Sequence, residues 1–437
     1  MTLTASAMLQ RRLALFLALL ALLPAPVEAQ LRGHGGPVRA LALSRDGGEL
    51  ISGSFDTTAI RWSLSTGTAE TVLRFHEGAL NAVAFLADGR TATSGEDGRI
   101  AIWQKGHDKP SDVLLGHSAP VVQLAVSPDG KTLASASWDG TVRLWPLGPL
   151  GGGPPRVLEG HRQNVNGVAF TRDGRALVSV GYDGTLRIWP LAAAASPRIL
   201  TLPSPLNAVA VAQSGEIIAA GASGRVYFLS PAGEASGEVE AAAAPLIALA
   251  ISSDDRQIAA SSIKGAVAII DRDSRSIART LVGPGLPAWA VVFLPDGRGL
   301  LTGGGDRVIR RWNSETGEQV GEVAIGGAVD ALAGFEGEPG AQVFRACVAC
   351  HTLKSQDGPR AGPTLAGVFG RKIASLPGYD FSPALKTLDI VWTPQTLSQL
   401  FELGPATYTP GSRMPEQKVG AEERAQLIQF LEKATKN

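Results

Sequence analysis

Residues 116–145 read GHSAPVVQLAVSPDGKTLASASWDGTVRLW. This stretch contains three short apolar runs, and the dipeptides Asp129-Gly130 and Asp139-Gly140 separate them. Short alternating apolar runs joined by such turns are typical of antiparallel strands. The stretch therefore predicts three consecutive antiparallel strands, with Gly116-His117 before the first and Trp145 at the end of the third.

The pattern is one of seven similar units, which follow one another at a spacing of about 41 residues from Leu31 to about Ile325. Turns between first and second strands are predicted at Asp46-Gly47, Asp88-Gly89, Asp129-Gly130, Asp173-Gly174, Asp255-Arg256 and Asp296-Gly297. A tryptophan follows the aspartate of the second turn by six residues in five units: Asp56 and Trp62, Asp97 and Trp103, Asp139 and Trp145, Asp183 and Trp189, Asp306 and Trp312. Four units also carry a Ser or Thr four residues before that aspartate and a His at their start: Ser52 and His34, Thr93 and His76, Ser135 and His117, Ser179 and His161.

These spacings resemble the WD-repeat family. The resemblance implies an all-β, seven-bladed propeller over about residues 31–325. It also implies that the His, the Ser or Thr, the Asp and the Trp of one blade form a buried hydrogen-bonded chain. We therefore expect the four histidines of these units to be structural rather than catalytic.

Three units depart from the pattern. Units five and six have Ser223 and Lys264 in place of the aspartate, and Leu229 and Ile270 in place of the tryptophan, so we expect apolar cores there. Unit seven keeps Thr302, Asp306 and Trp312 but has no histidine. The strand that closes the ring lies either near 30–33 or within 319–325, and the sequence does not choose between them.

The amino-acid composition and the N-terminus indicate where the protein acts. The chain has 437 residues with 40 basic and 40 acidic side chains, and no basic run exceeds a pair, which argues against nucleic-acid binding. Arg11-Arg12 precede an apolar run over 13–23, and Val27-Glu28-Ala29 is a small-residue cleavage pattern. This run is shorter than the roughly 20 residues of a membrane span. We expect a signal peptide over 1–29, cleaved after Ala29, a periplasmic location, and no membrane span in the mature protein.

The two cysteines of the chain occur together in Cys347-Val348-Ala349-Cys350-His351. This order is typical of c-type haem attachment, in which two thiols bond to the haem and the imidazole ligates its iron. A zinc site would need a further ligand, and no Cys or His follows His351. A redox dithiol is usually accompanied by a strand-helix-strand unit, which is absent from the pattern here. The motif therefore predicts one covalent haem c.

The second axial ligand is expected to be Met414. Met1 and Met8 belong to the proposed signal peptide, so Met414 is the one methionine of the mature chain. It follows a Pro-Gly turn and precedes a proline, on a loop rather than a helical face. A core-filling role is the alternative for such a residue.

Residues 338–437 resemble class I cytochrome c, an all-α fold. The resemblance implies that the Pro363 carbonyl accepts a hydrogen bond from the His351 ligand, and that Arg371, Trp392 and Ser412 hold the haem propionates. Phe381 and Phe401 stand where members of the family often carry Tyr. Helical spacing over 427–434 predicts a last helix that crosses the segment containing Gly340 and Phe344.

These features predict a multidomain chain, with a signal peptide (1–29), a propeller (30–325), a glycine-rich linker (326–337) and a cytochrome domain (338–437). The predicted function is single-electron transfer by an exported cytochrome rather than catalysis, with the propeller as a docking scaffold for a redox partner protein. The alternative is a periplasmic oxidoreductase whose propeller holds a second cofactor or substrate and passes electrons to the haem. The linker predicts that the cytochrome domain alone keeps its redox chemistry.

Overall fold

The structure is a computed structural model that describes residues 30–148, 153–192, 196–321, 332, 334–335, 337–345, 347–348, 350–414, 417 and 419–436. The expected signal peptide and most of the expected linker lie outside these residues. No helix in the described part of the chain is long and apolar enough to cross a membrane.

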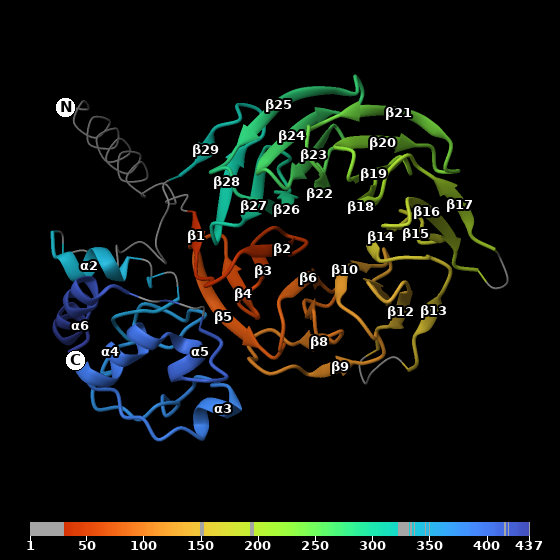
Figure 1. Cartoon of the computed structure of the whole chain (residues 1–437). Helices are drawn as coiled ribbons and strands as arrows, with labels where there is room; N and C mark the ends of the chain where they lie inside the picture. Colours follow the sequence, from red (N-terminus) through yellow and green to blue (C-terminus); the bar gives the residue numbers. More distant parts are fainter. Residues whose placement is uncertain are drawn as a thin grey trace, which may run out of the picture.

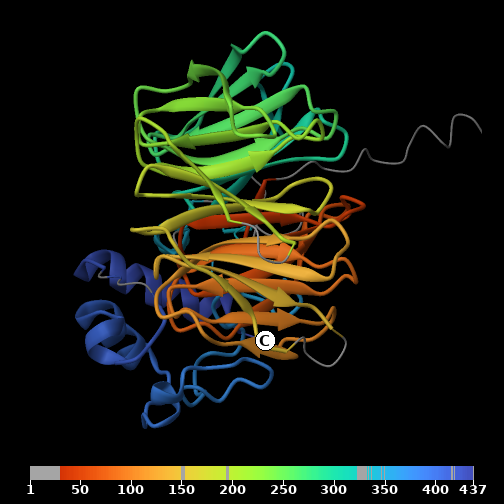
Figure 2. The same cartoon turned by 90° about the vertical axis from the view of Figure 1, so that its right-hand side faces the viewer.

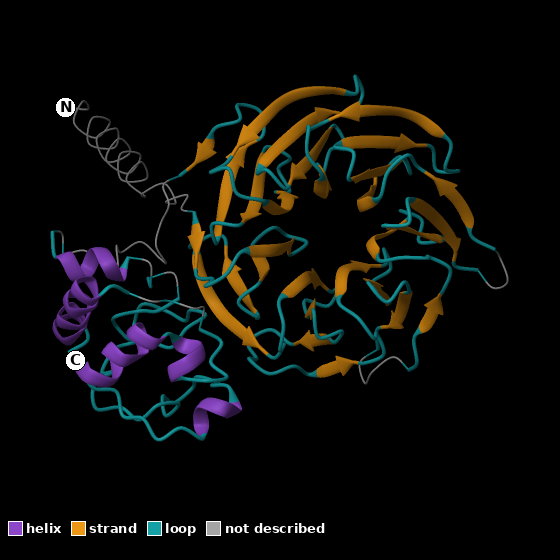
Figure 3. Ribbon diagram, viewed as in Figure 1, coloured by secondary structure: helices purple, strands orange, loops and turns teal. Residues whose placement is uncertain are grey.

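Seven antiparallel sheets stand around a central axis, and the helical segments lie beside this ring (Figures 1 and 3). The first strand of each sheet is nearest the axis (Figure 1). The first three sheets contain β2 (Val38–Leu43), β3 (Glu49–Ser54), β4 (Thr58–Ser63), β5 (Thr68–Arg74); β6 (Leu80–Phe85), β7 (Thr91–Gly95), β8 (Ile100–Trp103), β9 (Asp112–Leu114); β10 (Val121–Val126), β11 (Thr132–Ser137), β12 (Val142–Pro146), β13 (Arg156–Leu158). The seven-bladed fold expected from the repeats is confirmed.

The next three sheets are built in the same order. They contain β14 (Val165–Phe170), β15 (Ala176–Gly181), β16 (Thr185–Pro190), β17 (Arg198–Thr201); β18 (Leu206–Val211), β19 (Ile217–Gly221), β20 (Arg225–Leu229), β21 (Ala235–Glu240); β22 (Leu246–Ile251), β23 (Gln257–Ser262), β24 (Ala266–Asp271), β25 (Ser276–Val282). The second strand of each sheet is almost entirely buried, because neighbouring blades pack on both of its faces.

The hydrogen-bonded chain of His, Ser or Thr, Asp and Trp is present in four blades. In the third blade Trp145 Nε1 donates to Ser135 Oγ at 2.8 Å, and His117 contacts both Ser135 Oγ and Asp139 Oδ2 at 2.7 Å. Because the Asp139 carboxylate accepts from Nδ1, Nε2 is the acceptor for the hydroxyl. Equivalent contacts join His34, Ser52, Asp56 and Trp62; His76, Thr93, Asp97 and Trp103; and His161, Ser179, Asp183 and Trp189. The expected hydrogen-bonded chain is therefore present in all four blades, and the structural role of its histidines stays a prediction.

Replacing Asp139 with alanine is expected to lower the free energy of unfolding by about 1 to 3 kcal/mol, because the buried His117 donor then loses its partner. Chemical denaturation measures this change. Asp108→Ala, at an exposed loop position, is the matched control and should leave the free energy of unfolding unchanged. A fully stable Asp139→Ala variant would show that the buried chain carries no stability.

The propeller is also expected to lose stability in acid between about pH 4 and pH 2. Burial acts to raise the pKa of Asp97, but the hydrogen bond and charge of His76 outweigh it and hold the pKa at about 2. The pKa of Asp183 is likewise about 2, because backbone and Thr185 donors outweigh its burial. A carboxylate with a lowered pKa stabilises the fold above its unfolded pKa, near 4, and loses this effect as pH falls through the folded value. Unfolding measured against pH checks this expectation, and constant stability over this range would contradict it.

Blades five, six and seven differ from the others as the sequence predicts. Leu229 and Ile270, at the tryptophan positions, are buried in apolar clusters, so the expectation for blades five and six is confirmed. In blade seven Trp312 Nε1 donates to Thr302 Oγ1 at 2.9 Å, and Asp306 pairs with Arg310 in place of a histidine.

Both candidate segments close the ring, one at each end of the same strand. The last sheet consists of β26 (Ala288–Phe293), β27 (Gly299–Gly304), β28 (Val308–Asn313), β1 (Leu31–Arg32) and β29 (Gln319–Val320). Both β1 and β29 pair antiparallel with β28. The side chain of Gln30 joins them, since it donates to the Val320 carbonyl at 2.7 Å and accepts from the Arg311 backbone N–H at 3.0 Å.

One predicted turn is wrong by one residue. In blade six Asp254, not Asp255, accepts from the backbone N–H of Arg256, and Asp255 has a φ of 66°. The first blades place glycine at this left-handed position, such as Gly47 with a φ of 72°. The sequence Asp254-Asp255-Arg256 lacks the glycine that marks the register of the other turns, which explains the error.

The described residues of the C-terminal unit form five short helices around one apolar core. They are α2 (Pro339–Phe344), α3 (Pro383–Lys386), α4 (Pro394–Leu403), α5 (Pro405–Tyr408) and α6 (Ala421–Ala434). Helix α6 crosses α2 as expected, and Gly340 permits the close approach: a Cβ there would lie 2.1 Å from the Gln426 carbonyl. Figures 1 and 2 both place this unit beside the first blade.

Candidate cofactor site

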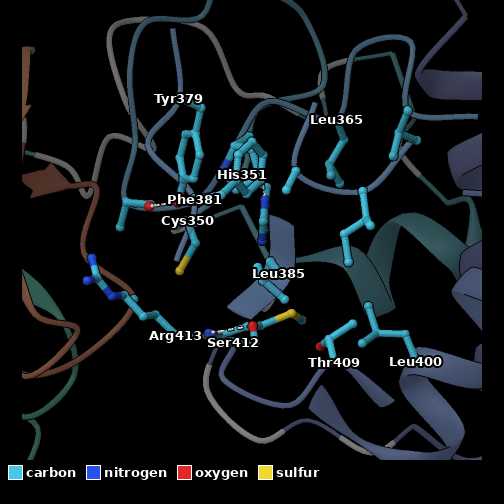
Figure 4. Close-up of a pocket in the computed structure, with 18 of the residues that line it drawn as sticks. Cys350, His351, Leu365, Tyr379, Phe381, Leu385, Leu400, Thr409, Ser412 and Arg413 are labelled. Carbon is cyan, nitrogen blue, oxygen red and sulfur yellow. Dashed lines mark hydrogen bonds between the residues drawn. The ribbon is translucent and has the colours of Figure 1, made fainter. Parts of the chain in front are cut away.

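The eight site residues that the sequence predicts all line one cavity of the C-terminal unit. They are Cys347, Cys350, His351, Pro363, Arg371, Trp392, Ser412 and Met414. They come from the segment after α2, the two loops that follow, the short segment that leads into α4 and the loop after α5. Figure 4 shows Cys350, His351, Ser412 and several apolar side chains around this cavity. Residues separated by 67 positions in the sequence therefore converge on one site.

The cysteines lie on tight turns at the end of α2. The Cys347 N–H donates to the Phe344 carbonyl at 2.7 Å, and the His351 N–H donates to the Cys347 carbonyl at 2.9 Å. Burial raises the pKa of Cys347 to about 11 and that of Cys350 to about 12, so both thiols are protonated at neutral pH in this apolar site. The turns place both sulfur atoms and the imidazole on the same cavity.

His351 is held in the tautomer that a metal ligand needs. Its Nδ1 lies 2.8 Å from the Pro363 carbonyl oxygen, which can only accept a hydrogen bond. Nδ1 therefore carries the proton. Burial lowers the pKa of His351, so the ring is neutral and Nε2 keeps its lone pair. This is the arrangement that the resemblance implied for His351 and Pro363.

Met414 reaches the same cavity from the loop after α5. Its backbone N–H donates to Ser412 Oγ at 3.1 Å, which fixes the end of the loop. The side chain is half-buried and packs against the core of the unit. The structure thus brings a thioether and an imidazole to one cavity, although 63 positions separate them in the sequence.

Arg371 and Trp392 line the cavity from two paired segments. The Arg371 guanidinium donates to the carbonyls of Thr364 at 2.8 Å and Ala366 at 3.2 Å, and burial lowers its pKa. The Trp392 backbone N–H donates to the Arg371 carbonyl at 2.9 Å. With Ser412 these side chains supply polar groups within a mainly apolar lining. Their expected role toward propionates stays a prediction.

Phe381 and Phe401 also line the cavity. Phe401 is buried in the core, whereas Phe381 packs on Tyr379 with 4.5 Å between the ring centroids. The Tyr379 hydroxyl donates to the Ala361 carbonyl at 2.7 Å. A tyrosine hydroxyl is thus present near this cavity, two positions before Phe381, and sequence reasoning did not single it out.

Four residues of the first blade, Gly35, Asp56, Thr58 and Arg74, line the same cavity, and sequence reasoning missed them. The motifs assign Asp56 to the blade and say nothing about Arg74. No local pattern could have found them, because about 290 positions separate Arg74 from the loop it contacts. Two units that the sequence treats as separate therefore share one site.

Two families match the chain. The family described as WD domain, G-beta repeat matches residues 26–63, 67–104, 108–146, 152–190 and 275–313, and the family described as Cytochrome c matches residues 337–435. The segments that match the WD family leave out residues 191–274, which include blade five and the first three strands of blade six, where the aspartate and tryptophan are replaced. The chain is 41% identical over 101 residues to cytochrome c type-1 of Ascaris suum, which covers 23% of this chain and 88% of that protein. It is also 41% identical over 108 residues to cytochrome c of Cochliobolus lunatus, 24% of this chain and 99% of that protein.

The donor set fits a covalent haem: two thiols, an imidazole with an available Nε2 and a thioether surround an apolar cavity. Gly362 leaves room beside the imidazole, since a Cβ there would lie 2.5 Å from His351 Cε1. The fold and site are those of an electron-carrying haem protein that is fused to a WD-repeat propeller. Through its C-terminal unit the chain belongs to the cytochrome c family.

Proposed function

We propose that the chain is an exported single-electron carrier with one covalent haem c ligated by His351 and Met414, whose propeller binds the redox partner protein. The observation that supports the proposal most directly is that all eight predicted site residues line one cavity. A bound haem supplies a one-electron iron couple there. The chain's own residues attach, ligate and orient it, and they exclude water from its faces.

Each group has a defined part in this proposal. Cys347 and Cys350 form the thioether bonds. His351 offers its Nε2 lone pair, and Pro363 keeps the ring in place through the Nδ1 proton. The Met414 thioether favours reduced iron and raises the potential. Arg371, Trp392 and Ser412 offer donors to the haem carboxylates.

The propeller offers a partner-binding surface at one mouth of its central channel. Trp138 and Tyr182, each the residue before the turn aspartate of its blade, are 42% and 51% exposed and line this mouth. Arg39 also lines it, and its guanidinium lies 4.9 Å from the Trp289 ring centroid and 5.6 Å from that of Phe55. Exposed aromatic side chains and stacked arginines are typical of protein-binding sites.

This mouth adjoins the cofactor site through one turn of the first blade. Phe55 packs on Trp289 at the channel, with 5.8 Å between ring centroids, and the next residue, Asp56, lines the cofactor cavity. A partner bound at the mouth is therefore close to the C-terminal unit. Short separation between redox partners supports electron exchange between them.

Intact-mass measurement of the purified protein tests the proposal. We expect a chain that begins at Gln30 and carries the mass of one haem, which acid-acetone extraction does not remove. The double variant Cys347→Ala/Cys350→Ala is the control, and its chain should lack the haem mass. A chain that keeps residues 1–29 would contradict export with cleavage after Ala29. Haem that extraction removes would contradict covalent attachment.

A further inference from the structure

We infer that Arg74 of the propeller is a positioning residue for His351, so that the first blade completes the haem site. The inference rests on the haem binding proposed above. Arg74 is the last residue of β5, and its Nη2 donates to the carbonyls of Arg360 and Ala361, the latter at 3.0 Å. In the opposite direction, the Ala361 N–H donates to the Gly33 carbonyl at 3.3 Å. The loop of the C-terminal unit is thus held by the blade from two sides.

The Ala361 carbonyl accepts hydrogen bonds from both the propeller and the C-terminal unit. Arg74 Nη2 and the Tyr379 hydroxyl both donate to it, at 3.0 and 2.7 Å. The Arg74 guanidinium also lies over the Tyr379 ring, 4.3 Å from its centroid. A desolvated cation over an aromatic ring and a charge-assisted hydrogen bond hold a long side chain in one orientation. Arg74, Tyr379 and Ala361 therefore form one fixed contact.

This contact lies two residues before the acceptor of the His351 proton. Gly362 follows Ala361, and its N–H donates to the Cys350 carbonyl at 2.8 Å. Pro363 comes next, and its carbonyl accepts from His351 Nδ1 at 2.8 Å. The segment 361–363 is thus joined at one end to the propeller and at the other to the imidazole. Fixing Ala361 restricts where the Pro363 carbonyl can lie.

The first blade also covers the Cys350 side of the site. A Cβ on Gly35 would lie 2.6 Å from Cys350 Sγ, so the backbone of this turn is in close contact with the cysteine. The Asp56 carboxylate accepts from the Gly35 N–H at 2.7 Å and from His34 Nδ1 at 3.0 Å. The hydrogen-bonded chain of the blade therefore holds the turn that covers Cys350.

The alternative is that Arg74 only joins the two units. Such a role would slow the exchange of the Ala361 N–H with solvent, since this N–H bonds to Gly33. It would not affect the exchange of the Gly362 N–H or of the His351 Nδ1 proton, whose acceptors lie within the C-terminal unit. Exchange of these two protons with solvent, followed by NMR in the full chain, separates the two roles. The Gly362 proton is measured in the haem-free chain and the His351 proton in the haem-loaded chain.

In Arg74→Ala both protons are expected to exchange about tenfold faster than in the wild type. Arg74→Lys keeps a cation over the ring and one donor, so its rates should lie within about threefold of the wild type. Arg275→Ala is the matched control, because Arg275 lies 5.0 Å from the Phe228 ring centroid and donates to the Ser236 carbonyl, far along the propeller. It should leave both rates unchanged.

If the exchange rates of the Gly362 and His351 protons are unchanged in Arg74→Ala, the inference is overturned. Arg74 then only connects the two units. If Arg74→Ala does not accumulate as folded protein, Tyr379→Phe serves instead, because it removes the other donor to the Ala361 carbonyl. The exchange of both protons with solvent should then be faster than in the wild type, by a smaller factor. Unchanged rates in that variant would also overturn the inference. Failure of haem attachment in the wild type would contradict the proposed function instead, and the Gly362 rate in the haem-free chain would still decide the role of Arg74.

Discussion

Replacing Met414 with alanine is expected to leave the haem covalently attached while abolishing the weak sulfur-to-iron absorption band and lowering the reduction potential. In the proposed site the attachment depends on Cys347 and Cys350, which the substitution does not change. The thioether stabilises reduced iron, so its loss should lower the potential by a large part of the roughly 0.8 V that axial ligands span. Optical spectra and potentiometric titration of the purified variant measure both effects.

Ser412→Ala is the matched control for this experiment. It removes the hydroxyl that accepts from the Met414 N–H at 3.1 Å but keeps the sulfur atom. We expect its absorption band to persist. A Met414→Ala variant with the wild-type band and potential would show that another group is the sixth ligand.

Removing the propeller is expected to slow electron exchange with the partner by roughly a hundredfold at equal haem concentration. The fragment 338–437 keeps most of the apolar core of the C-terminal unit and lacks only Leu332 and Phe335 of it, so it should still bind haem and give the spectrum of the intact chain. It lacks the channel mouth proposed to bind the partner, and with it the effective concentration that a second contact would supply. Stopped-flow mixing with the purified partner compares fragment and intact chain. Equal rates would leave the propeller without a docking role.

The same fragment should differ from the intact chain in its reduction potential. The sequence alone suggested that the two units are independent, but Gly35, Asp56 and Arg74 line the cofactor cavity. Without them water reaches the Cys350 side and favours the more highly charged oxidised state, so the potential should fall. The double variant Trp138→Ala/Tyr182→Ala changes only the channel mouth and should slow the partner reaction at an unchanged potential.

The sequence predicted those features that repeat or that lie close together along the chain. The His-Asp spacing recurs in four blades, and the two cysteines and His351 lie within five residues, so each signal is local. Asp254 was missed because the turn has no glycine to mark its register. The contact between Arg74 and Ala361 was missed for a different reason: its arginine sits in no motif, and its acceptors are backbone carbonyls, which any residue type provides.

Ring closure gave two equally good candidate segments because each is only two residues long in the sheet. A two-residue strand carries no alternation that could indicate pairing. The structure uses both segments on one strand, joined by Gln30. The residue that links them is a glutamine, whose amide can both donate and accept, and only the three-dimensional arrangement shows why it is suited to this position.

The order of residues at this closure links the folding of the two units. Leu31 and Arg32 form β1, and Gly33, whose carbonyl accepts from Ala361, follows directly. Since β1 pairs with β28, the meeting of the first and last blades fixes the position of Gly33, the acceptor of this contact. A one-residue slip in that pairing would turn side chains to opposite faces of the sheet and displace Gly33. Closure of the ring therefore also helps to place the haem-bearing unit on the first blade, because the same short segment pairs with the last blade and bonds to Ala361.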